Sequence, residues 1–219
     1  MKSDQIIDYL RKNAVPANLA GMARYGISID NALGISMPVL RQYAKQFKGD
    51  HELALKLWDS GIHEARIMAS IIDDPKKVTL KQMESWVHDF NSWDICDQTC
   101  GNLFDKSPFA YDVAMKWCKT EKEFVKRAGF VMMAELAVHD KKAIDEKFIP
   151  FFQCIIEGCI DDRNFVKKAV NWALRQIGKR SKNLYPIAIA TAEAIQKLNS
   201  KSAKWIATDA LRELRARSI

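Results

Sequence analysis

Apolar residues recur three and four positions apart along almost the whole chain, which is the spacing of amphipathic α-helices. Glycine and proline fall mainly between these runs, and strand-like alternation is nearly absent. The pattern therefore predicts an all-α protein. The expected helices cover residues 4–13, 17–25, 37–48, 51–60, 63–73, 80–89, 93–104, 108–118, 121–138, 144–158, 163–179, 184–198 and 201–217.

Three of these helices contain similar segments. VKRAGFVMMAELA (125–137), VKKAVNWALRQIG (166–178) and AKWIATDALRELR (203–215) recur at intervals of about 40 residues, the period of HEAT-type repeats. We therefore expect an α-solenoid of HEAT-like helical repeats, organised as a single domain over residues 1–219, with a concave face available to an extended ligand. A capping box at Thr120 and Glu123 is expected to start the helix at 121–138.

The composition is that of a soluble globular protein, with 48% hydrophobic and 28% charged residues and no apolar run as long as a membrane span. The N-terminus has an amphipathic helix pattern and no signal-peptide pattern, so we expect a cytoplasmic protein. The 5 cysteines form no CxxC motif, and the 4 histidines are scattered. We expect reduced core cysteines and neither a metal nor a cofactor. The formal net charge of +7 favours an anionic partner.

The stretch 91–104, NSWDICDQTCGNLF, is the first candidate for chemistry. If Ser92 caps a helix that begins at Trp93, four-residue spacing places Asp97 on one face with Trp93, Cys100 and Phe104. A carboxylate in such a stripe would have its pKa raised by desolvation, or would be kept charged by a cation. The alternative is an acidic helix N-terminus that favours the macrodipole.

The helix at 163–179 has an apolar face opposite a basic one. Lys168, Trp172, Arg175 and Lys179 follow one another at spacings of four, three and four. A tryptophan between cations can stack on a sugar or a base while the cations hold phosphates. The alternative is that Trp172 packs against a neighbouring repeat and is covered by Lys and Arg stems.

The helix at 121–138 is apolar almost all round, so Arg127 is a rare cation on it. Arg127 can pair with Glu123 at i,i−4, clamp a phosphate through its planar guanidinium, or keep Asp97 ionised. Arg41 and Arg66 can contact a DNA backbone or belong to solvated faces. Tryptophans that fall on other amphipathic helices are expected to be core residues: Trp58, Trp86 and Trp117.

Together these residues resemble the AlkD-type DNA alkylation repair family of HEAT-like DNA glycosylases. The resemblance covers most of the chain, from GISMPVLRQYAK (34–45) through LALKLWDSGIHEARIMASII (53–72) to the C-terminal repeats. No glycine-rich phosphate loop, Gly-x-Ser-x-Gly elbow or HExxH motif competes with it.

The resemblance implies specific roles. The family's catalytic W-x-x-x-D looks to be Trp93 and Asp97, its buried arginine falls on Arg127, and its second stacking tryptophan falls on Trp172. The DNA-binding cations would be Lys168, Arg175, Lys179, Arg41, Arg66 and Lys126, where Lys126 stands at a position at which arginine is common in the family. The implied activity is monofunctional excision of cationic N3- and N7-alkylated purines from duplex DNA without base flipping.

Double-stranded DNA that carries alkylated purines is thus the expected partner of a monomer that needs no obligate protein partner and no membrane. The protein would associate with the nucleoid when bound to DNA. The alternative is a non-catalytic helical-repeat module that binds damaged or branched DNA, or an acidic protein, through the same basic surface.

Overall fold

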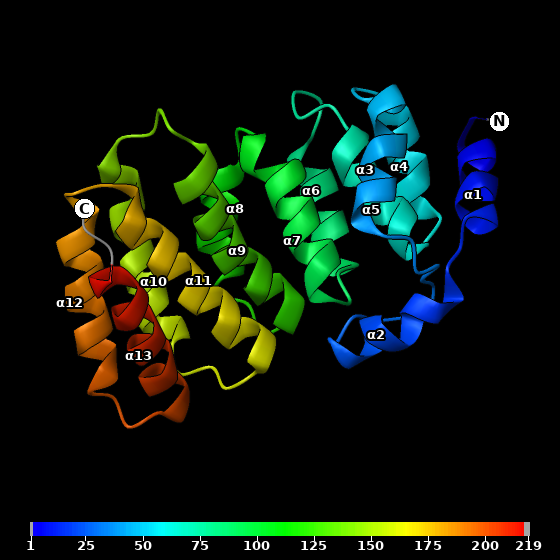
Figure 1. Cartoon of the computed structure of the whole chain (residues 1–219). Coiled ribbons are helices and arrows are strands. Elements are labelled where there is room, and N and C mark those ends of the chain that lie inside the picture. The colour runs from blue at the N-terminus through cyan, green and yellow to red at the C-terminus, as the bar shows by residue number, and fades with distance from the viewer. Residues whose placement is uncertain (1, 217–219) are drawn as a thin grey trace. The chain divides into compact units, whose positions relative to one another are not determined.

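The computed structural model describes residues 2–216, and within them the chain forms thirteen α-helices, four short 3-10 helices and no strand (Figure 1). The prediction of an all-α fold is confirmed. Every expected helix has a counterpart, with ends that differ by a few residues; the last expected helix ends at Arg215, and its final residue lies outside the described part of the chain. No helix in the described range is both long enough and apolar enough to cross a membrane.

The chain divides into two compact units, the first ending at Ser107 and the second beginning at Pro108. The first unit contains α1 (Lys2–Lys12), α2 (Leu19–Arg24), α3 (Met37–Ala44), α4 (His51–Asp59), α5 (His63–Ile72), α6 (Leu80–His88) and α7 (Trp93–Asn102). The second contains α8 (Ala110–Trp117), α9 (Glu123–His139), α10 (Ile149–Gly158), α11 (Asn164–Arg180), α12 (Leu184–Gln196) and α13 (Lys201–Arg215). The short 3-10 helices are Pro16–Asn18, Lys45–Phe47, Phe104–Lys106 and Asp145–Phe148. A single domain over 1–219 and a concave basic face stay predictions.

In the first unit, α5 is the central helix and packs against α3, α4 and α7. Trp58 on α4 and Trp86 on α6 stack with ring centroids 4.0 Å apart and planes 3° from parallel. Both rings are buried, and the ring of Phe104 lies 6.2 Å from that of Trp86. The prediction that Trp58 and Trp86 are core residues is confirmed, and Trp117 is buried in the second unit.

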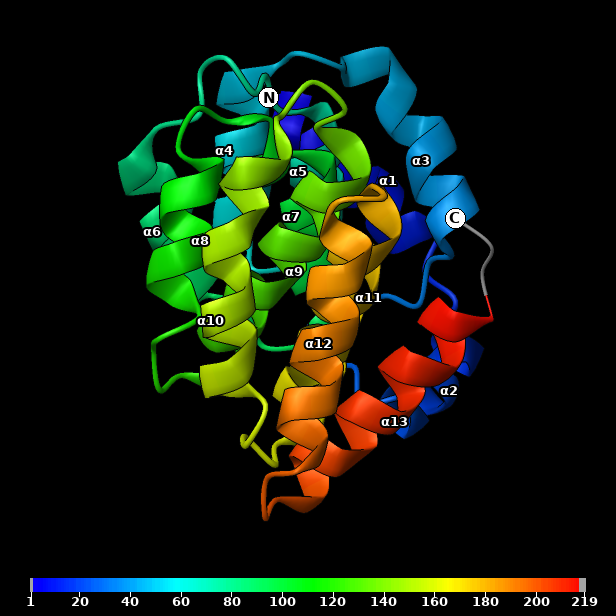
Figure 2. The same cartoon turned by 90° about the vertical axis from the view of Figure 1, so that its left-hand side faces the viewer.

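In the second unit, α11 packs against α9 on one side and α13 on the other, so the three similar sequence segments lie on adjacent helices. The partner helices α10 and α12 also lie side by side (Figure 2). This arrangement of stacked helical pairs is the one that the 40-residue period predicts. The expected apolar face of α11 is completely buried: Val166, Ala169, Val170, Ala173, Leu174 and Ile177.

Local sequence explains where several helices start. The side chains of Asp50, Thr79 and Ser200 accept hydrogen bonds from the backbone N–H three residues ahead. The predicted capping box at Thr120 is wrong, because α9 begins later, with Lys122 at the N-cap position. The Thr120 hydroxyl instead donates to the carbonyl of Trp117, at 2.8 Å.

Gly129 lets α9 approach the end of α8 closely. A Cβ at this position would lie 2.3 Å from the backbone nitrogen of Cys118 and 2.7 Å from its Cα. These are backbone atoms, so they cannot move aside as the end of a flexible side chain could. Any larger residue at position 129 must therefore push the two helices apart.

We expect Gly129→Ala to lower the free energy of unfolding by about 2 kcal/mol or more, because the added methyl overpacks a backbone contact. Gly21→Ala is the matched control, since α2 is helical there and a Cβ would meet no atom within 4 Å. The control should be neutral or stabilising by up to about 1 kcal/mol. Urea denaturation measures both changes, and equal stabilities would contradict the close approach.

Candidate functional site

Helix α7 carries the first pair of predicted site residues. It begins at Trp93, as predicted, and four-residue spacing puts Asp97 one turn further along the same face. Both side chains are half-buried, whereas Cys100 on the same face is fully buried. Phe104 is also buried, but the prediction that it continues this face is wrong, because α7 ends at Asn102 and Phe104 lies in the 3-10 helix that follows. Asp97 therefore lies at the edge of the core, where a carboxylate is shielded and can still be reached.

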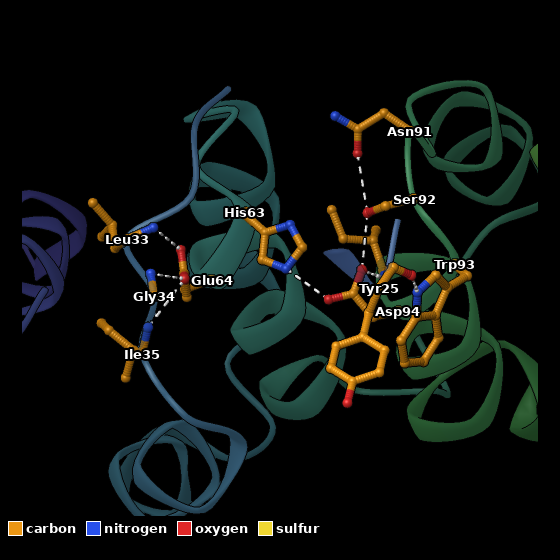
Figure 3. A network of polar contacts seen from close by, with 11 residues as sticks. Tyr25, Leu33, Gly34, Ile35, His63, Glu64, Asn91, Ser92, Trp93 and Asp94 are labelled. Carbon is orange, nitrogen blue, oxygen red and sulfur yellow. Dashed lines mark hydrogen bonds and ion pairs between the residues drawn. The ribbon is translucent and has the colours of Figure 1, made fainter. Parts of the chain in front are cut away.

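The tryptophan of this pair is fixed by a hydrogen bond. Its indole N–H donates to the backbone carbonyl of Tyr25, at 3.0 Å (Figure 3). The Tyr25 side chain is largely exposed, at 69%. Trp93 is thus held by a residue that sequence reasoning missed. No periodic pattern identifies Tyr25, which follows the short helix α2.

Asp94, an acid in the first turn of α7, makes specific hydrogen bonds there in addition to its favourable position in the helix macrodipole. Its carboxylate is 2.8 Å from His63 Nε2, and it accepts hydrogen bonds from the Ser92 hydroxyl, at 2.8 Å, and from the backbone N–H of Ile95 (Figure 3). Ser92 occupies the N-cap position, but its side chain accepts no hydrogen bond from the first turn of α7; its hydroxyl donates to Asp94. His63 is buried, and its Nδ1 has no partner among the described residues, which favours the Nε2–H tautomer that donates to Asp94.

Next to His63, the buried carboxylate of Glu64 holds the chain that leads into α3. It accepts backbone N–H groups from Leu33 at 2.8 Å, Gly34 at 2.7 Å and Ile35 at 3.2 Å (Figure 3). Adjacent side chains at the start of α5 therefore hold the segment before α3 and the first turn of α7. One sequence feature could have identified these contacts: the polar pair His63 and Glu64 at the start of a mainly apolar helix.

The second pair of predicted residues lies in the second unit. Arg127 on α9 is only 6% exposed, and its guanidinium donates to the carbonyl of Phe165 in the first turn of α11, at 2.6 Å. Trp172 on α11 is half-buried. Arg127 is thus held between two helices of the repeat, and its use as a phosphate clamp stays a prediction.

Two cations of the predicted basic stripe are paired with an acid on α13. Arg175 and Lys179 both contact the carboxylate of Glu213, and Lys179 does so at 2.5 Å. Burial raises the pKa of Glu213, but hydrogen bonds from Lys179 and Arg175 outweigh it and hold that pKa below its usual value. A phosphate at this position would have to compete with Glu213. The third cation, Lys168, is exposed.

Lys126 and Arg66 also contact acidic side chains of the same chain. Lys126 lies 3.1 Å from Asp161, which Arg163 contacts as well. Burial raises the pKa of Asp161, but these two cations outweigh it and lower the pKa to about 2. The guanidinium of Arg66 lies over the Trp58 ring, 5.3 Å from its centroid, and 3.4 Å from the Asp89 carboxylate.

The predicted DNA-binding cations therefore fall into two groups. Arg41 and Lys168 are exposed and have no carboxylate within 4.0 Å among residues 2–216. The other four are at least partly buried and are paired with a neighbouring acid: Arg66, Lys126, Arg175 and Lys179. Contact with DNA stays a prediction for both groups. Arg41 and Lys168 would bind a phosphate at a lower cost in free energy, because neither has to give up a carboxylate partner.

The Glu64 anchor is tested by Glu64→Ala, which leaves three buried or half-buried N–H groups without their acceptor. We expect the free energy of unfolding to fall by about 3 kcal/mol or more. Amide hydrogen exchange at residues 33–35 should accelerate. Glu52→Ala, at an exposed position on α4, is the control and should change neither quantity. Unchanged exchange at residues 33–35 in Glu64→Ala would show that the loop is held by other contacts.

Comparison with known proteins agrees with this fold. The model of a protein family described as DNA alkylation repair enzyme matches residues 6–214. A solved structure described as "A new family of proteins related to the HEAT-like repeat DNA glycosylases with affinity for branched DNA structures" superimposes with a TM-score of 0.80 and 19% identity, over 97% of this chain and 95% of that one. At this identity the similarity shows the HEAT-like fold, as predicted. A comparison with curated protein sequences gives no significant match.

Proposed function

This chain belongs to the DNA alkylation repair enzyme family, and we propose that it is a monofunctional DNA glycosylase that excises cationic N3- and N7-alkylated purines from duplex DNA. The observation that carries the proposal is the pair on α7. Asp97 is half-buried one turn from Trp93, and the Trp93 indole is held in place by Tyr25. A shielded carboxylate beside a fixed aromatic ring suits a reaction that develops positive charge on a sugar.

The positive charge of an alkylated purine determines what the enzyme has to stabilise. Alkylation at N3 or N7 gives the purine a positive charge, so the base leaves without protonation by an enzyme acid. Positive charge then builds on the deoxyribose as the N-glycosidic bond lengthens, and a carboxylate beside C1′ stabilises this oxocarbenium-like state. In the proposal Asp97 is that carboxylate, and it also orients or deprotonates the attacking water.

The remaining residues would bind the nucleotide. As the family resemblance implies, the half-buried rings of Trp93 and Trp172 would contact the deoxyribose. Arg127, whose guanidinium donates to the Phe165 carbonyl, would hold a nearby phosphate. Lys168, which is exposed on α11, would neutralise a backbone phosphate. No step needs a Schiff-base lysine, so the product would be an abasic site. The lesion would stay stacked rather than enter a base pocket.

Asp97→Asn removes the charge and keeps the size of the side chain. We expect release of N7-methylguanine from methylated duplex DNA to fall by roughly 10²-fold or more, equivalent to about 3 kcal/mol of transition-state stabilisation. Duplex binding should be unchanged or tighter. Asp59→Asn, at an exposed position at the end of α4, has the same charge change and should keep full activity. Full activity in Asp97→Asn would remove this carboxylate from the mechanism.

Lesion choice gives an independent test. An enzyme that stabilises the sugar cation, and that does not hydrogen-bond the base, should select for labile cationic bases. N3- and N7-alkylpurines, including bulky ones, should be released, whereas hypoxanthine, uracil and ethenoadenine should remain in the duplex at matched concentrations. Efficient release of hypoxanthine, or a sharp cutoff with adduct size, would point to a closed base pocket and overturn the mechanism.

A second candidate is a non-catalytic module that binds branched or damaged DNA. It is favoured by the description of the similar solved structure, whose family has affinity for branched DNA. Competition between a four-way junction and an unbranched duplex, measured beside the N7-methylguanine assay, separates the two candidates. Junction preference with no base release supports the binding module, and base release supports the glycosylase.

A further inference from the structure

The first unit contains a cationic pocket that is separate from the Trp93 and Asp97 pair. Its volume is about 540 Å³, within the usual range for small-molecule sites. Four cations line it: Arg41 on α3, Lys45 and Lys48 just after α3, and Lys106 just after α7.

Three of the four cations in this pocket are available to a ligand. Arg41, Lys45 and Lys48 are exposed, and within residues 2–216 none of them has a carboxylate within 4.0 Å. The Arg41 guanidinium donates to the amide oxygen of Gln98, at 2.8 Å, and the Lys45 ammonium donates to that of Gln42, at 2.9 Å. Neutral amides of this kind leave the positive charges uncompensated, in contrast to the carboxylate-paired cations of α9 and α11.

The negative groups at the pocket are already occupied. Asp73 is the one carboxylate in the lining, and its side chain is 0% exposed. It accepts hydrogen bonds from Gln82 Nε2, at 2.7 Å, and lies 2.6 Å from His51 Nδ1. Lys106 donates to the carbonyls of Gly101 and Asn102 and so covers the negative end of α7. An anion in the pocket would therefore meet a net positive field.

Another part of the wall is apolar and comes from Ala44, Ile71 and Pro75. A free inorganic anion would leave this surface unused, whereas a sugar or base attached to a phosphate would cover it. We propose that the pocket binds a nucleotide phosphate, held by Arg41, Lys45 and Lys48, with the sugar or base against the apolar wall. The site goes beyond the proposed excision activity and does not depend on it, because it includes neither Trp93 nor Asp97.

The test compares two double variants of the full chain. Lys45→Gln/Lys48→Gln removes two pocket charges, and Lys12→Gln/Lys81→Gln removes two exposed charges of the same unit that do not line the pocket. Thymidine 5′-monophosphate should shift the backbone amide NMR signals of residues 41–48 in the wild type and in the control, and not in the pocket variant. Thymidine, which lacks the phosphate, should shift them much less.

A lesion-free duplex then identifies the source of the phosphate. If the pocket takes a phosphate of a DNA strand, the slope of log affinity against log salt becomes shallower by about 0.9 for each pocket lysine removed, beyond the change in the control. If it takes a free nucleotide, the two variants have the same slope while the monophosphate shifts persist. No monophosphate shift at residues 41–48, together with equal slopes, would overturn the proposal, whatever the outcome of the base-release assay.

Discussion

The close packing of inner helices is the constraint on which the rest of this structure depends. Helix α9 has α8 on one side and α11 on the other, so nearly all of its surface is buried. A helix in that position tolerates a polar side chain only when a partner satisfies it, as the Phe165 carbonyl does for Arg127. It also needs Gly129 where its backbone meets α8. The same packing that stabilises the stack therefore sets the orientation of a predicted site residue.

Charge pairing decides how much of the net charge of +7 can attract an anion. Several cations that look suited to phosphate binding are paired with Glu213, Asp161 or Asp89, which partly compensate their charge. Among residues 2–216, the cations without a carboxylate partner include Lys168 on α11 and the pocket residues Arg41, Lys45 and Lys48. Because phosphate affinity depends on uncompensated charge, these residues are better candidates for nucleic-acid contact than the paired ones.

Hydrogen bonds from distant residues fix the start of α7, where the proposed site residue Trp93 lies. His63 and Glu64, adjacent on α5, hold the start of α7 through Asp94 and the chain before α3 through three backbone amides. Trp93 is in turn tied to Tyr25. In the proposed mechanism, an aromatic ring that is already oriented would need little rearrangement when charge develops on a substrate, which is the main requirement of electrostatic catalysis.

The sequence by itself determined the helices, their repeat period and the α7 pair, because hydrophobic spacing and a four-residue interval are local properties of the chain. It also identified the buried tryptophans and the apolar face of α11. Only the tertiary structure decided which cations are paired with an acid, since Glu213 and Asp161 lie more than thirty residues from the cations that they contact on α11 and α9. The role of Asp94, the Tyr25 contact and the cationic pocket likewise depend on side chains that are distant in sequence, and no periodicity encodes such contacts.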